Sequence, residues 1–482
     1  MKRYSLIYSL LILVCSCADL LDEPIYSQLA PENVFEAEEG IQSILFAGYS
    51  ELANTTGNNR GICGIEEWGT DIGWQSGGGE NSTAVQFLNF TLGSTTSLIK
   101  NVFWDPNYRG IRNANVVLDN IDKSNTVAQN KELFIAEAKF IRAMCYAKMY
   151  FLFGPVPLRT SENDDLELPR PSVEIMESFI ENELLEVSNV LPKPGAELNY
   201  GRAHQGAVWG ALTKFYLNTH QWEKCVNASQ KILDLNYYNL YPDFEQLFRV
   251  ENEINTEFIW VKSVNVYATR SNSWVCATFP PGFQTHPRTG LTWQDNWKTI
   301  ASQYRLLDEY YNSFESGDTR RNLIMESYIN TSGDSISLLN HDNTRSFKYW
   351  PDPNAAGNIH GNDLPQIRYS DILLSRAEAL NEINGPNQES IDLINLVRNR
   401  ATLENIQLSD FNTKESLRNH ILIERGWEFY SEGMRRYDMI RMGKFIPYAQ
   451  SQGKQAQSFH TLLPIPQQAI DANSLLEQNP GY

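Results

Sequence analysis

The sequence predicts a mainly α-helical protein, built as a scaffold of paired helices that two long, loop-rich insertions interrupt. A helix-forming run with several alanines ends at a Gly-Pro stop, and two later segments each read as helix, break and helix. Two intervening segments are rich in Gly, Asn, Ser, Thr and Pro and hold only short β-like runs. Strands are therefore expected to be a minor component.

Composition places the chain among folded proteins. Its 482 residues are 42% hydrophobic and 12% aromatic, which is enough apolar material for a large core. The 40 Lys and Arg residues against 58 Asp and Glu residues give a formal net charge of −18. Nucleic acid is not expected as a partner, because a surface that neutralises phosphates needs an excess of positive charge.

The N-terminus reads as an export signal over residues 1–16. A basic pair, Lys2 and Arg3, precedes an apolar run that is too short to cross a membrane as a mature helix. The run ends where the small residue Ser16 precedes Cys17, a pattern that resembles a bacterial lipobox. The resemblance implies cleavage before Cys17 and its lipidation. The alternative is an ordinary exported protein with an incidental cysteine.

The rest of the chain is expected to be a short tether and one domain. Residues 17–32 form the acidic tether, and residues 33–482 form the domain, with insertions near residues 61–96 and 264–365. Length alone would allow about three domains. Stacked hairpins with long insertions account for the same length in a single domain.

Helical signals are strongest in three places. Residues 131–153 contain helix formers throughout and stop before Gly154. Residues 202–235 and 367–401 each place small residues on one helix and larger ones on the next within about 34 residues, which is the tetratricopeptide arrangement. Such hairpins bury a core only against neighbours, so about three or more should stack.

Charged residues near the C-terminus have helical spacing. Glu424, Arg425 and Glu428 lie on one helix-like run, followed by Arg435 and Asp438. Opposite charges three or four positions apart fit either a fixed network of ion pairs or an ordinary solvated face.

Short motifs follow one another in a fixed order along the whole chain. They are CADLLDEP at residues 17–24, WDPNYRGIRNAN at 104–115, EAKFIRA at 137–143, GPVP at 154–157, IRYSDILL at 367–374, AEALN at 377–381, ERGWEFYSEGMRRYD at 424–438, LPIP at 463–466 and QNPGY at 478–482. Each motif is weak alone, but together the chain resembles the SusD/RagB family of outer-membrane lipoproteins of Bacteroidetes.

The resemblance implies a function as well as a tetratricopeptide-like fold. Family members are lipid-anchored at the cell surface, dock on a SusC-like TonB-dependent outer-membrane barrel, and hand it a captured nutrient, most often a glycan. They are binding proteins, so neither an enzyme activity nor a cofactor is expected, and no metal ligand is assigned. The alternatives are capture of a peptide, as by RagB-like proteins, and a helical-repeat assembly scaffold without a small ligand.

Aromatic residues of the two insertions are the candidate ligand-binding residues. Proteins hold sugars by laying aromatic rings against their C–H faces and by aiming polar side chains at their hydroxyls. Asp71 and Trp74 lie in the Gly-rich first insertion, and Trp274, Trp293 and Trp297 lie in the second. We assign these five residues to ligand binding. For each tryptophan, packing in the core is the competing interpretation.

The sequence lacks the motifs of common enzymes. GxSxG, HExxH and P-loop patterns are absent, and the glycines at residues 77–79 lack the lysine of a phosphate cradle. Glu66 and Asp71 could be imagined as a glycosidase dyad, but among 58 acidic residues such pairs arise by chance. Whether Cys63 and Cys276 form a disulfide is left open by the sequence.

Overall fold

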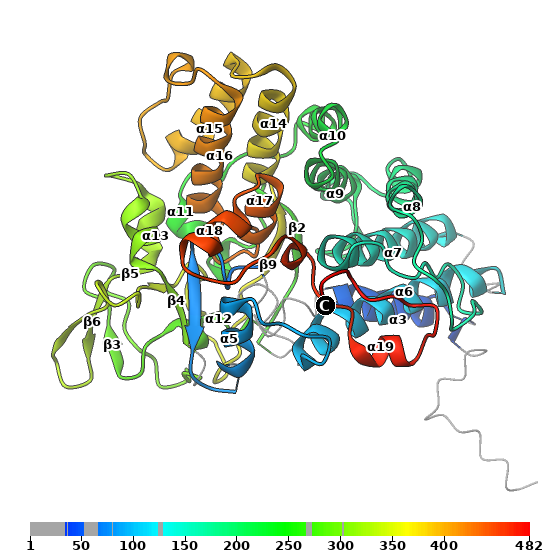
Figure 1. Ribbon diagram of the computed structural model, residues 1–482, viewed down its shortest axis with the longest axis horizontal. Coiled ribbons are helices and arrows are strands. Elements are labelled where there is room, and N and C mark those ends of the chain that lie inside the picture. Colours follow the sequence, from blue (N-terminus) through cyan, green and yellow to red (C-terminus); the bar gives the residue numbers. More distant parts are fainter. Residues whose placement is uncertain are drawn as a thin grey trace, which may run out of the picture.

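A computed structural model of the chain is shown in Figure 1. It describes residues 34–35, 37–52, 66–79, 81–123, 129–266, 272–300 and 303–482. The expected signal peptide (1–16) and tether (17–32), with Cys17, lie outside the described residues, as does Cys63. Within those ranges, no helix combines the length and the apolar character that a membrane span requires.

Packed helices form most of the fold, as the sequence predicts. In the right half of Figure 1, α3 packs on α6 and α7, and α7 packs on α8; at the top, α9 packs on α10. The bounds are α3 (Glu38–Leu52), α6 (Asp105–Asn120), α7 (Lys131–Phe153), α8 (Val173–Val187), α9 (Gln205–Asn218) and α10 (Trp222–Asp234). The helix expected over residues 131–153 is α7, and the hairpin expected over residues 202–235 is α9 with α10.

A second group of helices continues this stack at the upper left of Figure 1. Helix α14 packs against α10, α15 and α16, so the second expected hairpin, α14 with α15, joins the first directly. The bounds are α14 (Tyr369–Asn384), α15 (Gln388–Arg400) and α16 (Lys414–Phe429). Helices α17 (Arg435–Arg441) and α18 (Phe445–Ser451) follow nearer the centre, and α19 (Gln467–Asp471) lies below α3 in the right half. The fold is therefore mainly α and tetratricopeptide-like.

Local signals explain where these helices begin and end. The side chain of Asn387 accepts a hydrogen bond from the Ser390 backbone N–H at 2.9 Å and caps the start of α15. Thr413 and Ser416 form a capping box at the start of α16. Gly385 ends α14 with a φ of +80°, a left-handed conformation that glycine adopts without strain.

Small residues allow the helices to approach closely. A Cβ atom built on Gly110 of α6 would lie 2.6 Å from the Sγ atom of Cys145 in α7. Ala136, Ala138 and Ala143 of α7 are buried as well. Small side chains therefore help α7 to pack against α3, α6 and α8 at the same time.

Most of the short strands lie in the loop-rich half at the lower left of Figure 1, and one pair lies near the centre. Strand β1 (Gly73–Ser76) pairs with β4 (Gln303–Leu306), and β2 (Phe258–Lys262) pairs with β9 (Leu364–Arg368), both antiparallel. The remaining pairs join β3 (Phe283–Thr285), β6 (Ser327–Asn330) and β7 (Ser335–Ser337), and β5 (Ile324–Met325) with β8 (Arg345–Ser346). The pairing of β1 with β4 links the first insertion to the second.

Short helices complete the two insertions. The Gly-rich first insertion holds α5 (Asn81–Asn89) beside β1, and the second holds α12 (Trp274–Thr278) and α13 (Asp308–Ser313). The first insertion is therefore more ordered locally than a Gly-rich stretch predicts, because β4 supplies hydrogen-bond partners for β1.

The charged C-terminal residues form a buried network rather than a solvated face. Arg320 Nη1 lies 2.6 Å from Glu424 Oε1, and Arg368 Nη1 lies 2.9 Å from Glu428 Oε1. Arg368 Nε is also 2.7 Å from Glu432 Oε2. All five side chains are fully buried. Charges removed from water in this way are held only when each has a well-placed partner, so the network ties α16 to the second insertion and to β9.

Candidate functional site

Trp74 lies on the β1–β4 ribbon, half-buried and held from two sides. Its Nε1–H donates a hydrogen bond to the Asp342 backbone oxygen at 2.7 Å. The guanidinium of Arg305, directly opposite in the strand register, lies 4.7 Å from the centre of the ring. This arrangement fixes the indole in one orientation, as a platform for ring stacking requires.

Asp71 precedes β1 and makes a bidentate ion pair. Its Oδ1 accepts a hydrogen bond from Arg435 Nε at 2.7 Å, and its Oδ2 accepts one from Arg435 Nη2 at 2.5 Å. The Asp71 side chain is 29% exposed, whereas Arg435 is buried. Any ligand contact by Asp71 would therefore be made by a carboxylate that α17 already holds in place.

Trp274 and Trp297 are 2% and 5% exposed, respectively, and both pack among aromatic side chains. The ring centre of Trp274 lies 5.4 Å from that of Tyr304. Trp297 donates a hydrogen bond from Nε1 to the Asp352 backbone oxygen at 3.1 Å. Both indoles are covered by protein, as core packing requires.

Trp293 lies at the edge of this aromatic group. It is half-buried, and its ring meets that of Trp297 at 84°, with centres 5.6 Å apart. Its neighbours Thr292 and Gln294 are exposed. Trp293 therefore has a buried partner behind it and open polar residues beside it, which suits a ring that contacts a hydrated ligand.

The structure brings the aromatic residues of both insertions into one layer. Trp74 and Trp274 line the same small pocket together with Tyr304 of β4. Phe279 follows α12, and its ring centre lies 6.3 Å from those of Trp293 and Trp297. Trp274, Phe279, Trp297 and Tyr304 belong to one hydrophobic core cluster, and Trp293 packs against it. We call these rings together with Trp74 the aromatic layer, of which Trp74 and Trp293 are the half-buried tryptophans.

Sequence reasoning missed Arg305 and Tyr304, which hold Trp74 and Trp274. No local motif marks either residue, because their role depends on the register of β1 against β4.

Cys276 is a buried thiol whose Sγ lies 3.4 Å from His360 Nε2, while Cys63 is outside the described residues.

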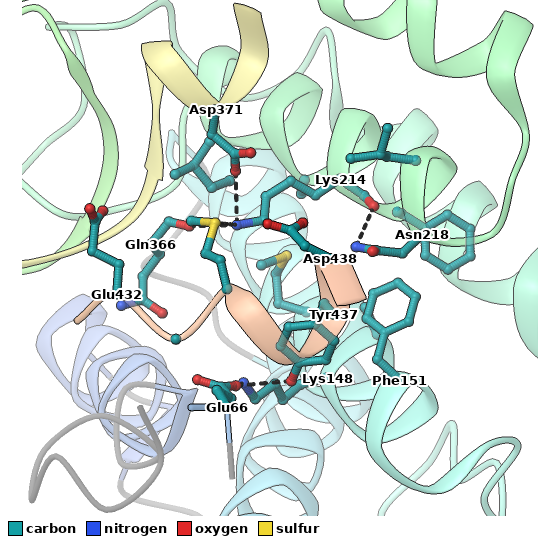
Figure 2. Close-up of a pocket in the computed structure, with 18 of the residues that line it drawn as sticks. Glu66, Lys148, Phe151, Lys214, Asn218, Gln366, Asp371, Glu432, Tyr437 and Asp438 are labelled. Carbon is teal, nitrogen blue, oxygen red and sulfur yellow. Dashed lines mark hydrogen bonds and ion pairs between the residues drawn. The ribbon is translucent and has the colours of Figure 1, made fainter. Parts of the chain in front are cut away.

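A second feature is a central cavity of about 150 Å³, which Figure 2 shows. Lys214 of α9 lies 3.1 Å from Asp371 Oδ2 of α14, and Lys148 of α7 pairs with Glu66 at the other end of the view. The hydroxyl of Tyr437 donates to Glu66 Oε1 at 2.9 Å. The cavity therefore lies where α7, α9, α14 and α17 meet.

The charges of the central cavity are largely paired with one another. Burial, together with the like charge of Lys214, lowers the pKa of Lys148 to about 7. The Lys148 ammonium group pairs with Glu66. Burial works against ionisation of Asp371, but Lys214 and Arg425 hold the pKa of that carboxyl well below its usual range. The space is also smaller than the roughly 300–1,000 Å³ of typical ligand pockets, so an oligosaccharide does not fit there.

Comparisons with known proteins identify the family. Residues 343–482 match the SusD family, and residues 19–217 match a family described as starch-binding associating with outer membrane. The chain is 26% identical to SusD-like protein P25 of Formosa agariphila, with 99% of each chain covered. It is 24% identical to the starch-binding protein SusD of Bacteroides thetaiotaomicron, with 72% of each chain covered.

Solved structures share the fold over nearly the whole chain. A laminarin binding SusD-like protein aligns with a TM-score of 0.80 at 22% identity, covering 93% of this chain and 100% of that one. Surface glycan-binding protein A of Bacteroides thetaiotaomicron, in complex with laminarihexaose, aligns with a TM-score of 0.74 at 21% identity, covering 92% and 99%. The two family matches, over residues 19–217 and 343–482, together with the SusD-like relatives and structures, support a SusD-like family protein.

Proposed function

We propose that this protein captures a glycan at the cell surface and delivers it to a SusC-like TonB-dependent outer-membrane barrel. The observation that carries the proposal is the aromatic layer of the loop-rich half, in which the half-buried Trp74 and Trp293 come from different insertions. Two ring platforms backed by a rigid core suit a ligand with several sugar units. Relatives named for starch, laminarin and glycan binding support the same class of cargo.

Glu66 and Asp71, the two carboxylates considered above as a glycosidase dyad, are both held by cationic side chains. This arrangement fits binding without catalysis. Glu66 is buried between Lys148 and Tyr437, and Asp71 is held bidentate by Arg435. A glycosidase needs one carboxyl that is kept protonated and a second that faces the sugar. Carboxylates held by cations are poor general acids, which supports a binding role.

The five proposed ligand-binding residues make different contributions in this proposal. Trp74 and Trp293 stack on the sugar rings, and Asp71 offers an oriented acceptor to a hydroxyl. Trp274 and Trp297 support the platform from behind, since both are buried against other rings. Lipidation of Cys17 would hold the protein at the outer membrane, where the barrel lies.

Affinity electrophoresis in gels that contain candidate polysaccharides tests the ligand site. Trp74→Ala and Trp293→Ala should lose retention in the gel that retards the parent protein. Trp222→Ala is the matched control, because Trp222 is a half-buried tryptophan of α10, on the helical half. Unchanged retention of both variants would refute the site, and binding of peptides alone would assign the scaffold to peptide capture.

The anchor and the barrel partner have separate tests. Cys17→Ala should move the protein from the membrane fraction to the soluble fraction of cells. The lipidated parent, solubilised in detergent, should copurify with a TonB-dependent barrel. Membrane retention of Cys17→Ala would refute lipidation at that residue, and purification without any barrel would refute the delivery step.

A further inference from the structure

A pocket on the helical half has no part in the function proposed above. It lies between the segment that leads into α9, the segment that follows α10, and strand β2, and it encloses about 260 Å³. Six of its lining side chains matter here: Glu197, Tyr200, His204, Tyr237, Tyr238 and Trp260. This tyrosine pocket shares no lining residue with the pocket that contains Trp74.

Aromatic rings form its walls, and the polar ends of two of them are tied to the backbone. The Tyr200 hydroxyl donates to the Glu253 backbone oxygen at 2.7 Å, and Trp260 Nε1–H donates to the Gly201 backbone oxygen at 3.0 Å. The rings of Tyr237 and Tyr238 meet at 79°, with centres 5.1 Å apart. The walls are therefore preorganised for a ligand.

The pocket opens to solvent on one side. Tyr237 is 42% exposed and Ile254 is 81% exposed, and both line the pocket. The left-handed loop residue Gly195, with a φ of +80°, lies against the Tyr237 hydroxyl, which a Cβ atom at that position would approach to 3.0 Å. A small group can therefore enter past Tyr237 without displacing a secondary-structure element.

Glu197, itself half-buried, brings a negative charge to this pocket. Its Oε2 atom is buried and has no hydrogen-bond partner among the described residues, and the same holds for the hydroxyl oxygen of Tyr238. None of the residues that line the pocket is a lysine or an arginine. A buried carboxylate oxygen without a donor is costly, which points to a donor that arrives with a ligand.

Electrostatic effects on the neighbours place the Glu197 charge within the pocket. Burial is the main cause of the raised pKa of Tyr238, and Tyr237 and Glu197 raise it further. Burial lowers the pKa of His204, and Glu197 opposes that shift. Burial is also the main cause of the raised pKa of Tyr200, and Glu197 is one of the carboxylates that raise it further. The carboxylate therefore acts on three side chains of the pocket wall.

We propose that the tyrosine pocket binds a protonated primary amine carried by a small sugar or side chain. An ammonium group supplies N–H donors to Glu197 Oε2 in a charge-assisted hydrogen bond. It is also attracted by the faces of tyrosine and tryptophan rings, the combination that recognises cationic ligands elsewhere. An apolar group of the same size would leave the carboxylate oxygen without a donor, and a neutral donor would form only the weaker, uncharged hydrogen bond.

The same chemistry occurs in an amino sugar and in a lysyl side chain, so two probes distinguish the sources. Isothermal titration of the parent protein is made with D-glucosamine and with Nα-acetyl-lysine amide. N-acetyl-D-glucosamine and Nα-acetyl-norleucine amide are the neutral counterparts. We expect at least one amine to bind and its neutral counterpart to bind about tenfold or more weakly, because a hydrogen bond to a charged group is lost.

Variants test each part of the pocket. Glu197→Gln keeps the shape and removes the charge, and it should weaken amine binding about tenfold or more. Tyr237→Ala removes a ring and should weaken binding, whereas Tyr237→Phe keeps the ring and should retain most of it. Glu404→Gln, at an exposed glutamate after α15, is the matched control and should bind like the parent. Thermal melts by circular dichroism confirm that each variant is folded.

The outcomes separate cleanly. Binding of glucosamine alone assigns the pocket to amino sugars, binding of the lysine derivative alone assigns it to peptides, and binding of both assigns it to the ammonium group itself. The proposal is overturned if neither amine binds, if the neutral counterparts bind equally well, or if Glu197→Gln binds like the parent. Glu197→Gln should keep full retention in polysaccharide gels, so failure here leaves the glycan proposal untouched.

Discussion

Asp71 and Arg435 are 364 positions apart in the sequence, and their side chains form a bidentate pair with N···O distances of 2.7 and 2.5 Å. The pair ties Asp71, two residues before β1, to the first turn of α17. The first insertion, which carries Trp74, is thereby joined to the C-terminal helices. The position of β1, which carries the proposed ligand-binding ring of Trp74, thus depends on a helix that is distant in the sequence.

Removal of the Asp71 charge should destabilise the protein. Asp71→Asn leaves the buried guanidinium of Arg435 without its carboxylate, so the free energy of unfolding should fall by about 1–3 kcal/mol. Urea unfolding followed by circular dichroism measures the change. Glu186→Gln is the control, because Glu186 pairs with Lys139 at an exposed site and such pairs contribute about 0–1 kcal/mol. Equal stability of Asp71→Asn and the parent would mean that the pair contributes nothing.

The tryptophans of the aromatic layer should separate into two classes. Trp274→Ala and Trp297→Ala remove buried rings and should each lower the free energy of unfolding by about 3–5 kcal/mol. Trp74→Ala and Trp293→Ala remove half-buried rings, so they should cost less stability while losing polysaccharide retention. Thermal unfolding combined with affinity electrophoresis measures both properties. A full loss of retention at normal stability for Trp274→Ala would place that ring at the ligand surface.

Asp371 should make the protein sensitive to acid. Its pKa is held below the ordinary value in the folded state by Lys214 and Arg425, against the effect of burial, so the ionised carboxylate stabilises the fold above the unfolded-state value of about 4. This stabilisation is lost as the pH falls below that value, because the unfolded chain then binds the proton first. Asp371→Asn should lower stability at pH 7 and flatten its decline in acid.

Unfolding free energies measured from pH 7 to pH 3 test the role of Asp371. Asp295→Asn is the matched control, since Asp295 is exposed in the second insertion. It should follow the parent over the whole range. A variant Asp371→Asn with the parent's pH dependence would show that other carboxyls set the acid limit.

Close packing of α6 on α7 predicts a clash at Gly110. Gly110→Ala places a methyl group 2.6 Å from the Cys145 sulfur, so the two helices must move apart, at a cost of about 1–3 kcal/mol. The double variant Gly110→Ala with Cys145→Ala removes the sulfur and should recover part of that loss. Gly93→Ala, with no heavy atom within 4 Å of its added Cβ, is the control in the same unfolding assay.

Helices were the most predictable part of this fold. The run at residues 131–153 became α7 with those bounds, and both expected hairpins formed and packed on each other. Their signals are short-range: helix-forming residues, apolar positions repeated at the helical period, and stops such as Gly154 and Gly385. The ion-pair network was visible as charge spacing, although its partners Arg320 and Arg368 lie outside the charged run.

The site was predictable in composition and not in arrangement. The residue types of the insertions predicted tryptophans that contact a ligand. In the structure, Trp274 is buried, and Trp74 is half-buried on a strand. Nothing near Trp74 in the sequence distinguishes it from Trp274. Burial is set by what packs against a ring, and here the packing residues arrive from β4.

Local patterns in the chain were therefore enough for the helical scaffold and its hairpins, because hydrogen bonds and side-chain contacts within a helix join residues only a few positions apart. The aromatic layer, the Asp71–Arg435 pair and the tyrosine pocket arise from contacts between distant segments. Strand register and helix packing select those contacts from many that the composition would allow. Tertiary packing, rather than residue type, is what divides the similar tryptophans of the two insertions into buried supports and half-buried platforms.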